Sequence, residues 1–258
     1  MRRLGLATVV VSLLLPGMGA VLAASGTRDV QATPQRPAKS SNADTVAEGY
    51  VEMEVGVAHD SDAFDSSLLF RMGLHRRIEF YFGLNPFITR EIDGETETGI
   101  GDSLVGGKVR FFEAKEGNAA IEVFVRIPSA DEDKGLGTGD LDAGFRFIAS
   151  RTWDVQHFDF NLGGDFAGVP DSGSNEARWT TILAWSRPWG DRLGHYGELF
   201  LQFLPATDDE TITTDWGLTY RLNPSFVLDA GVNVGLSEDA PDFQFTLGLT
   251  KVLGRAFH

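Results

Sequence analysis

The 258-residue sequence predicts an all-β fold, a single twelve-stranded antiparallel transmembrane β-barrel of the outer-membrane type. Three observations predict it. Apolar residues recur at every second position from Glu48 onward, twelve such segments follow one another, and the connections between them alternate between long and short. An even number of strands with long connections at one end and short turns at the other is typical of bacterial outer-membrane barrels.

Two segments precede the predicted barrel. Residues 1–23 have the order of a secretory signal peptide, with two arginines, an apolar stretch and small residues up to Ala23. Pro16 and Gly17 interrupt the apolar stretch, which argues against an uncleaved membrane anchor. Residues 24–47 are polar and cannot offset their ordering entropy by apolar burial. We predict a cleaved signal peptide, a flexible periplasmic leader over residues 24–47 and a barrel over residues 48–258.

Each alternating segment has roughly the ten residues that a tilted strand needs to cross a bilayer. The first seven cover residues 51–57, 68–74, 78–84, 105–111, 121–127, 141–147 and 158–166. Five more are centred near Leu183, Leu201, Leu218, Ala230 and Leu247. We expect long connections over residues 87–101, 128–139 and 168–177, and short turns near residues 113–118, 149–152, 193–194 and 223–224.

A soluble β-sandwich or lipocalin-like barrel would show the same alternation with its apolar face turned inward. Two features favour a membrane barrel. Charged residues of both signs occupy the polar face in mid-strand, while the apolar face has almost none. Aromatic residues gather near predicted strand ends, as in interfacial girdles; they include Phe111, Trp153, Trp189, Tyr196, Phe226, Phe87 and Trp179. We therefore predict that the apolar face contacts lipid and the polar face lines a lumen.

Side-chain parity assigns eleven charged residues to the predicted lumen. They are Arg71, Lys108, Arg110, Glu122, Arg126, Arg146, Asp159, Asp165, Asp215, Arg221 and Asp229. Because both signs occur, mutual ion pairing is one interpretation of the set. The other is that four basic residues on three consecutive strands, Lys108, Arg110, Arg126 and Arg146, give a pore a local preference for carboxylates.

Composition excludes several other classes of function. The formal net charge of -15 makes a nucleic-acid partner unfavourable, because phosphates would be repelled. The absence of Cys excludes disulfides, thiolate metal sites and a Cys nucleophile. The acidic residues Asp131, Glu132, Asp133, Asp140 and Asp142 lack the order of an EF-hand, so we assign neither a metal nor a cofactor.

One arrangement could support catalysis. His157 and Asp159 share one face of a predicted strand, where a carboxylate could orient an imidazole, and Ser150 is the closest hydroxyl candidate. An outer-membrane enzyme such as a lipid hydrolase is therefore an alternative function.

A glycine-rich motif occurs twice with an offset of two strands. The first copy contains Gly99, Gly101, Asp102 and Gly106, and the second contains Gly137, Gly139, Asp140 and Gly144. The spacing is not that of a dinucleotide-binding loop. We interpret it as hairpin repetition within one barrel, in which the acid lies near the rim and the last glycine relieves crowding.

These repeats and three further segments resemble the outer-membrane barrel family labelled putative meta-pathway of phenol degradation. The further segments are Trp216–Leu222, Leu228–Leu236 and Ala240–Phe243, and the resemblance extends from about Glu48 to Leu253. Members of that family are regarded as transporter-like barrels, sometimes encoded near the catabolism of aromatic compounds. The resemblance therefore implies passage of small molecules.

From these observations we expect an outer-membrane channel for passive passage of small solutes, aromatic or carboxylate-bearing among them. Expected partners are the solute, outer-membrane lipids and lipopolysaccharide, and the barrel-assembly machinery. A second alternative is a structural or surface-interaction barrel whose lumen is plugged.

Overall fold

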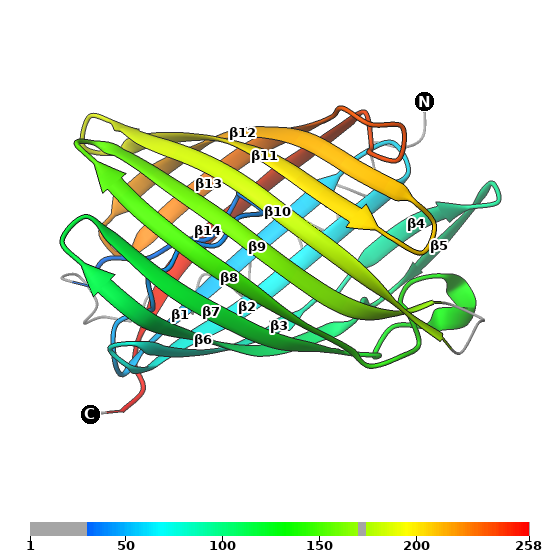
Figure 1. Cartoon of the computed structure of the whole chain (residues 1–258), viewed down its shortest axis with the longest axis horizontal. Coiled ribbons are helices and arrows are strands. Elements are labelled where there is room, and N and C mark those ends of the chain that lie inside the picture. The colour runs from blue at the N-terminus through cyan, green and yellow to red at the C-terminus, as the bar shows by residue number, and fades with distance from the viewer. Residues whose placement is uncertain (1–29, 170–173, 258) are drawn as a thin grey trace.

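Antiparallel pairing joins twelve strands into a closed barrel in the computed structural model, which describes residues 30–169 and 174–257 (Figure 1). The strands are β1 (Tyr50–His59), β2 (Ala63–His75), β3 (Ile78–Leu84), β6 (Ser103–Ala114), β7 (Gly117–Ile127), β8 (Asp142–Trp153), β9 (Gln156–Val169), β10 (Ser174–Trp189), β11 (Leu193–Leu204), β12 (Asp209–Asn223), β13 (Phe226–Gly235) and β14 (Phe243–Arg255). The barrel closes because β1 pairs with both β2 and β14. The predicted fold is confirmed.

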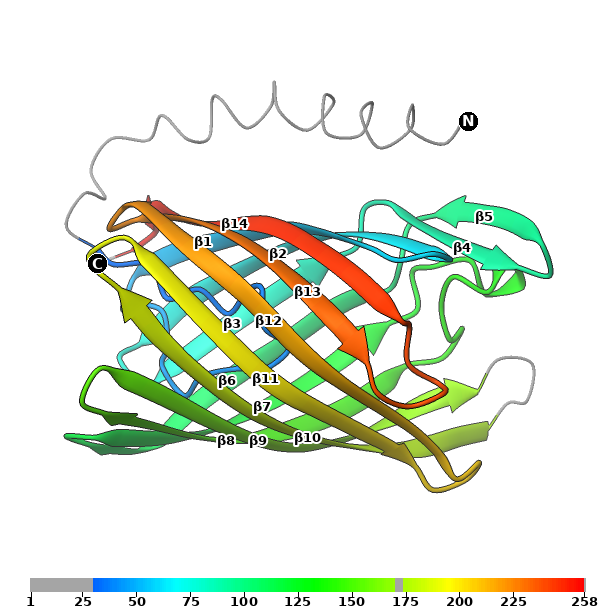
Figure 2. The ribbon, with the colours of Figure 1, turned by 90° about the horizontal axis from the view of Figure 1, so that it is seen from above.

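A hairpin lies in the connection between β3 and β6. Its strands, β4 (Ile88–Ile92) and β5 (Glu95–Gly99), pair with each other, and β4 also pairs with the first residues of β2. The β7–β8 connection contains a short 3-10 helix, η1 (Glu132–Lys134). These long connections lie at one end of the barrel, which we call the loop end (Figure 2). Five short turns lie at the opposite end, which we call the turn end; they cover residues 76–77, 115–116, 154–155, 190–192 and 224–225.

Three predicted connections are wrong in detail. Strands β9 and β10 stay paired as far as Val169 and Ser174, which leaves no long connection over residues 168–177. The turn predicted near residues 149–152 lies after Trp153, and the turn predicted at residues 193–194 precedes Leu193. Apolar alternation fades where glycine and polar residues continue a strand, whereas backbone pairing continues there.

The two faces of the barrel have opposite chemistry. Outward-facing apolar side chains are exposed, such as Val123 at 57% and Leu247 at 60%, while inward-facing charged side chains are buried, such as Lys108 at 1%. A soluble barrel would show the reverse, since its apolar residues must leave water. The arrangement fits a barrel whose outer wall contacts lipid and whose backbone groups are all paired around the ring. Among the described residues, no helix has the length and apolar character to cross a membrane.

Four residues of the predicted aromatic girdle are exposed, and one points into the barrel. Trp153, Trp189 and Trp179 are exposed, as a position at the membrane interface requires. Tyr196 instead is buried, and its ring lies over Gly217 on the inner face, since a Cβ atom at that glycine would meet the ring. Its position beside a turn suggested the girdle, but its parity is that of the inward-facing Glu198.

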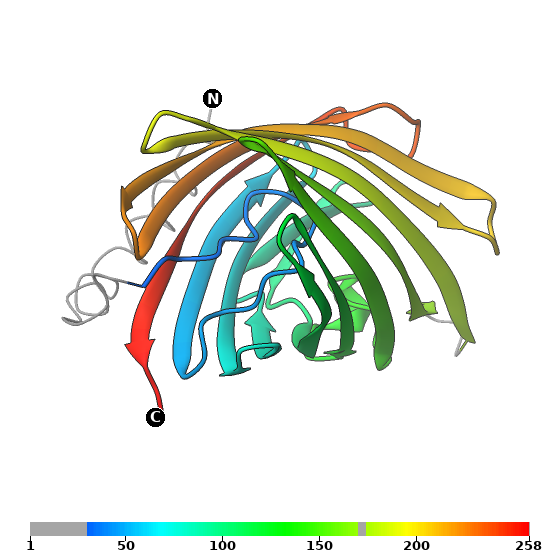
Figure 3. The same cartoon turned by 60° about the vertical axis from the view of Figure 1, so that its left-hand side comes forward.

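The segment predicted as a leader lies inside the barrel wherever the structure describes it. Residues 30–47 run among the inner faces of the strands at the turn end (Figure 3). The backbone N–H of Ala32 donates to the carbonyl oxygen of Pro224 in one turn, and that of Val46 donates to the Glu79 carboxylate. The segment has no core of its own, and the wall supplies the partners that its composition lacks. The predicted signal peptide and residues 24–29 lie outside the described residues.

Candidate functional site

The structure places the eleven charged residues assigned by parity on the inner face of the barrel. Ten of them form ion pairs with the wall or with the leader; they are Arg71, Lys108, Arg110, Glu122, Arg126, Arg146, Asp159, Asp165, Asp215 and Asp229. The eleventh, Arg221, lines a cavity beside the leader. The lumen is therefore the candidate functional site.

Arg71 on β2 lies at the centre of three glutamates, which we call the Arg71 cluster. Its Nε is 2.9 Å from Glu79 Oε1, and its Nη1 is 3.0 Å from Glu54 Oε1 and 3.9 Å from Glu52 Oε2. All four side chains are buried. The three glutamates were absent from our predicted lumen set, although the parity that identified Arg71 would have identified them too.

The four residues of the predicted basic cluster are all paired. Lys108 Nζ is 3.2 Å and Arg146 Nη1 is 3.8 Å from the Glu122 carboxylate, and Arg110 Nη1 is 3.2 Å from Asp44 Oδ1 of the leader. The Arg126 Nη1 atom is 2.8 Å from Asp165 Oδ2 and 3.3 Å from Asp142 Oδ2, and Arg178 Nη2 is 2.6 Å from the same Asp165 oxygen. Arg126 and Arg146 nevertheless keep 35% and 28% of their side chains exposed, so both remain accessible from the lumen.

Three carboxylates on adjacent strands, Glu198, Asp215 and Asp229, form what we call the acidic arc. Its cations come from the leader. Lys39 Nζ is 3.2 Å from Asp215 Oδ2, and Arg36 Nε is 3.6 Å from Asp229 Oδ1. Glu198 accepts hydrogen bonds from the backbone N–H groups of Lys39, at 2.7 Å, and Ser40, at 3.1 Å. The leader thus compensates charge that this side of the wall leaves uncompensated.

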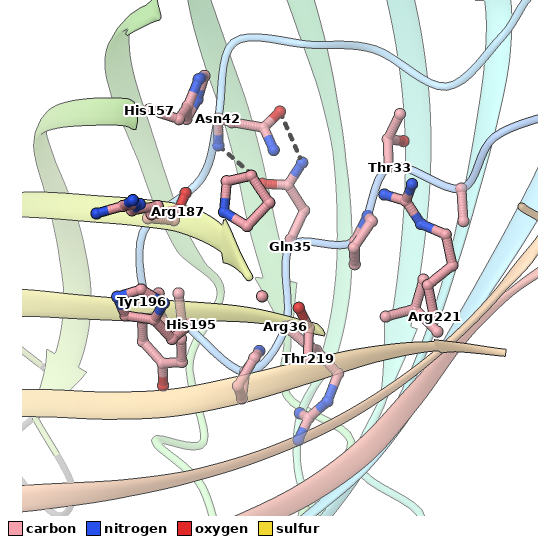
Figure 4. A pocket seen from close by; sticks show the side chains of 18 of the residues that line it. Thr33, Gln35, Arg36, Asn42, His157, Arg187, His195, Tyr196, Thr219 and Arg221 are labelled. Atoms are coloured by element: carbon pink, nitrogen blue, oxygen red, sulfur yellow. Dashed lines mark hydrogen bonds between the residues drawn. The ribbon is translucent and has the colours of Figure 1, made fainter. Parts of the chain in front are cut away.

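The second half of the leader contacts the opposite side of the lumen. Ser41 donates its backbone N–H to Asn161 Oδ1 at 2.7 Å and its hydroxyl to Glu122 Oε1 at 2.7 Å. Lys108 Nζ donates to the carbonyl oxygen of Asn42 at 2.8 Å. Within the leader, the Asn42 N–H donates to Gln35 Oε1 at 2.8 Å, which holds its two arms together (Figure 4). The leader is therefore a hydrogen-bonded loop that spans the lumen.

A cavity of about 520 Å³ remains between the leader and the wall of β9 to β13. Gln35, Arg36 and Asn42 line it from the leader, and Tyr196 and Arg221 line it from the wall (Figure 4). The Arg221 Nε atom is buried and has no hydrogen-bond partner among the described residues. A cavity of this size is in the range that binds small molecules.

The two glycine-rich motif copies meet at the loop end. Asp102 of the first copy accepts hydrogen bonds from the backbone N–H groups of Ser129, Ala130 and Thr138, so it anchors the β7–β8 connection. A Cβ atom at Gly137 of the second copy would meet this carboxylate. The motif aspartate of the first copy therefore anchors a loop at the rim of the barrel.

The remaining motif glycines leave room for neighbouring side chains, as predicted for the last glycine of each copy. A Cβ atom at Gly106 would overlap the Tyr81 ring, and one at Gly144 would overlap the Phe124 ring. The other close approaches are Gly99 to Leu136, Gly101 to Asn85 and Gly139 to Glu132, whereas Asp140 contacts Gly168. The motif glycines thus allow neighbouring side chains to pack closely against the backbone.

His157, Asp159 and Ser150 are close together but in the wrong order for a catalytic triad. The His157 Nε2 atom is 3.2 Å from Asp159 Oδ1, and the Ser150 hydroxyl donates to the same oxygen. The carboxylate therefore lies between the hydroxyl and the imidazole, whereas a triad requires the imidazole to accept the hydroxyl proton. Ser150 Oγ also accepts the backbone N–H of Ala43 in the leader. The arrangement binds the leader.

Metal binding has no support in residues 30–169 and 174–257, where no three His, Cys, Asp or Glu side chains are grouped to hold an ion. In the β7–β8 connection, the acidic residues Glu132 and Asp133 form the first turn of η1.

A closed barrel with an apolar exterior and a charged interior is the architecture of outer-membrane β-barrels. The chain is similar to the crystal structure of an outer membrane channel from Pseudomonas putida F1, with a TM-score of 0.68 and 12% identity over 83% of this chain and 99% of that one. It is also similar to the KdgM porin, with a TM-score of 0.58 and 8% identity over 80% and 99%, and to the NanC porin, with a TM-score of 0.57 and 10% identity over 78% and 98%.

The chain belongs to the family described as "Putative MetA-pathway of phenol degradation", which matches residues 24–250. This match confirms the resemblance based on the glycine-rich repeats and the segments after Trp216. No curated protein sequence matches the chain.

Proposed function

We propose that the protein is a channel for passive passage of small solutes across the outer membrane. The observation that carries the proposal is the charged inner wall, with a cavity of about 520 Å³ that the leader leaves open beside β9 to β13. A wall of mixed charge favours hydrated solutes and provides sites at which they bind weakly. The fold shared with outer-membrane channels and porins supports the location.

We further propose that carboxylate-bearing and aromatic solutes are among those that pass. Three arginines support the carboxylate part: Arg126 and Arg146 are partly exposed to the lumen, and Arg221 lines the cavity. The family description, which refers to phenol degradation, supports the aromatic part. Outer-membrane lipids, lipopolysaccharide and the assembly machinery are the proposed partners of the barrel itself.

A second candidate function is a plugged structural or surface-interaction barrel. The leader favours it, because residues 33–46 contact strands on both sides of the lumen. Conductance of the purified full-length protein in planar bilayers separates the two candidates. Liposome swelling with sugars, amino acids and aromatic acids then identifies the solutes. Absence of both conductance and swelling would favour the plugged barrel.

The carboxylate preference is tested by replacing Arg126 and Arg146 with Gln together. We expect the reversal potential in a salt gradient to shift toward cation preference, because two accessible positive charges are removed from the lumen. Arg151→Gln is the matched control, since Arg151 is 73% exposed and lies outside the lumen. An unchanged reversal potential in the double variant would contradict the preference.

A further inference from the structure

The guanidinium group of Arg36 lies in a depression of the barrel wall that two glycines create. Gly56 on β1 and Gly248 on β14 are directly opposite each other in the β1–β14 ladder. A Cβ atom at either position would overlap the Arg36 side chain. Neither glycine has a positive φ angle, so the backbone conformation does not require glycine there. Glycine is needed at both positions because a side chain there would fill the space that the flat guanidinium group occupies.

The depression continues as a row of four residues on adjacent strands. Gly56 pairs with Ser67 on β2, and Gly248 pairs with Asp229 on β13. The row therefore runs from a hydroxyl, over two residues without side chains, to a carboxylate. We call these four residues the glycine cradle.

Two of the three Arg36 nitrogens donate hydrogen bonds in or beside the glycine cradle, and the third, Nε, faces Asp229 with no hydrogen-bond partner among the described residues. Nη1 donates to Ser67 Oγ at 3.3 Å, Nη2 donates to the Leu247 carbonyl oxygen at 3.1 Å, and Nε is 3.6 Å from Asp229 Oδ1. The Asp229 side chain is 1% exposed, and neither of its oxygens has a hydrogen-bond partner among the described residues. Acceptors spread around a flat space match the planar fork of a guanidinium, which presents donors in fixed directions.

The other cation in the described part of the leader, Lys39, is bound in a different way. Lys39 Nζ donates to Thr213 Oγ1 at 2.8 Å, is 3.2 Å from Asp215 Oδ2 and lies 4.6 Å from the centre of the Phe200 ring. No glycine is needed at that site, because an ammonium is compact. The wall thus distinguishes a flat cation from a compact one at two sites that are three leader residues apart.

Arg36 connects the glycine cradle to the cavity beside the leader. Arg36 keeps 20% of its side chain exposed and lines the cavity beside the leader (Figure 4). A small cation that reaches this cavity would therefore meet the site from the same side as Arg36.

We propose that the glycine cradle is a binding site for solutes that carry a planar guanidinium or amidinium group, and that Arg36 occupies it as an internal ligand. Such a solute binds there when Arg36 leaves. The proposal rests on the proposed function in one respect, since a solute reaches the site through the lumen.

The test uses full-length Arg36→Ala protein in detergent micelles and two probes of equal charge, methylguanidinium and methylammonium. By titration calorimetry we expect methylguanidinium to bind the variant at least about tenfold more tightly than methylammonium, because only the former uses the fork of acceptors. Wild-type protein should bind methylguanidinium more weakly than the variant, since Arg36 competes. Equal binding of both probes to the variant would overturn the proposal.

The matched control adds Gly56→Ala to Arg36→Ala. The three atoms nearest to a Cβ atom at Gly56 all belong to Arg36, so the methyl group occupies the emptied space. Binding of methylguanidinium should fall at least about tenfold, as loss of the flat space and of two hydrogen bonds predicts. Unchanged binding in the double variant would also overturn the proposal. Heat-modifiable electrophoretic mobility reports whether each variant forms a barrel.

A second measurement needs no variant. Cleavage within residues 30–47 of the wild-type protein by proteinase K, which has no pocket for a cation, should be faster in methylguanidinium than in equal methylammonium, because displacement of Arg36 frees the leader. Equal rates would count against the site. A protein that binds methylguanidinium selectively but never conducts would remove the proposed function and keep the site. A protein that conducts but does not bind methylguanidinium selectively would keep the proposed function and remove the site.

Discussion

The lumen contains two groups of three carboxylates that obtain their cations from different sources. In the Arg71 cluster, Glu52, Glu54 and Glu79 surround an arginine that belongs to the wall itself. In the acidic arc, Asp215 and Asp229 pair with Lys39 and Arg36 of the leader. The leader also donates hydrogen bonds to Glu52, Glu54 and Glu79. One side of the barrel therefore has a cation of its own, whereas the other side obtains its cations from the leader.

The difference has an energetic consequence. Removing one partner of a buried ion pair is costly because the remaining charge is left in a poorly solvated place. Arg71 belongs to the wall and stays with its three glutamates, whereas Lys39 and Arg36 leave Asp215 and Asp229 if the leader departs. We infer that the Arg71 cluster stabilises the barrel and that the acidic arc retains a segment that can exchange.

The largest expected effect is that of Arg71→Met. It leaves three buried glutamates without their cation, which we expect to lower the free energy of unfolding by about 3–5 kcal/mol. Urea unfolding in lipid vesicles, followed by tryptophan fluorescence, measures it. Arg71→Lys serves as the control, because lysine keeps the positive charge but lacks the planar guanidinium group. A midpoint equal to that of the wild type would contradict the structural role of the cluster.

A smaller effect on stability is expected for Lys39→Met. Loss of its bonds to Asp215 and Thr213 should lower the free energy of unfolding by about 1.5–3 kcal/mol, the range for a hydrogen bond to a charged group. The reversal potential should also shift toward cations, since the acidic arc gains an uncompensated charge. If this variant were destabilised as much as Arg71→Met, the contrast between the two groups would be lost.

The pair itself is tested by adding Asp215→Asn to Lys39→Met. The amide needs no cation, so the double variant should be more stable than Lys39→Met alone, with a coupling energy on the order of 1 kcal/mol. A double-mutant cycle from the same urea titrations gives this value. Strict additivity would mean that the 3.2 Å contact contributes nothing of its own.

The smallest effect is expected for Arg151→Gln. This arginine pairs with Glu116 at 3.8 Å, and the two side chains are 73% and 65% exposed. An exposed pair contributes less than about 1 kcal/mol. A larger loss of stability in the unfolding titration would show that exposed ion pairs outside the lumen contribute as much as the buried pairs inside it.

Sequence reasoning succeeded where the signal was local. Alternation with a period of two identified all twelve barrel strands and placed residues such as Lys108 and Asp215 on the inner face, since successive side chains of a strand point to opposite sides. It was less successful at turns, as at Trp153 and Val169, because pairing continues through residues that carry no apolar signal. Tyr196 was also predicted wrongly. Its place beside a turn suggested an outward-facing girdle residue, whereas its parity along the strand pointed inward.

The sequence by itself determined the barrel, the outward direction of its apolar face and the charged character of its lumen, because each depends on neighbouring residues within one strand. Only the tertiary structure decided that residues 30–47 lie in the lumen and which charges pair. The Glu198 and Glu122 carboxylates that bind the leader come from β11 and β7, and only ring closure brings such distant strands around one segment. A polar leader has no apolar core of its own, so its place is decided by the wall that surrounds it.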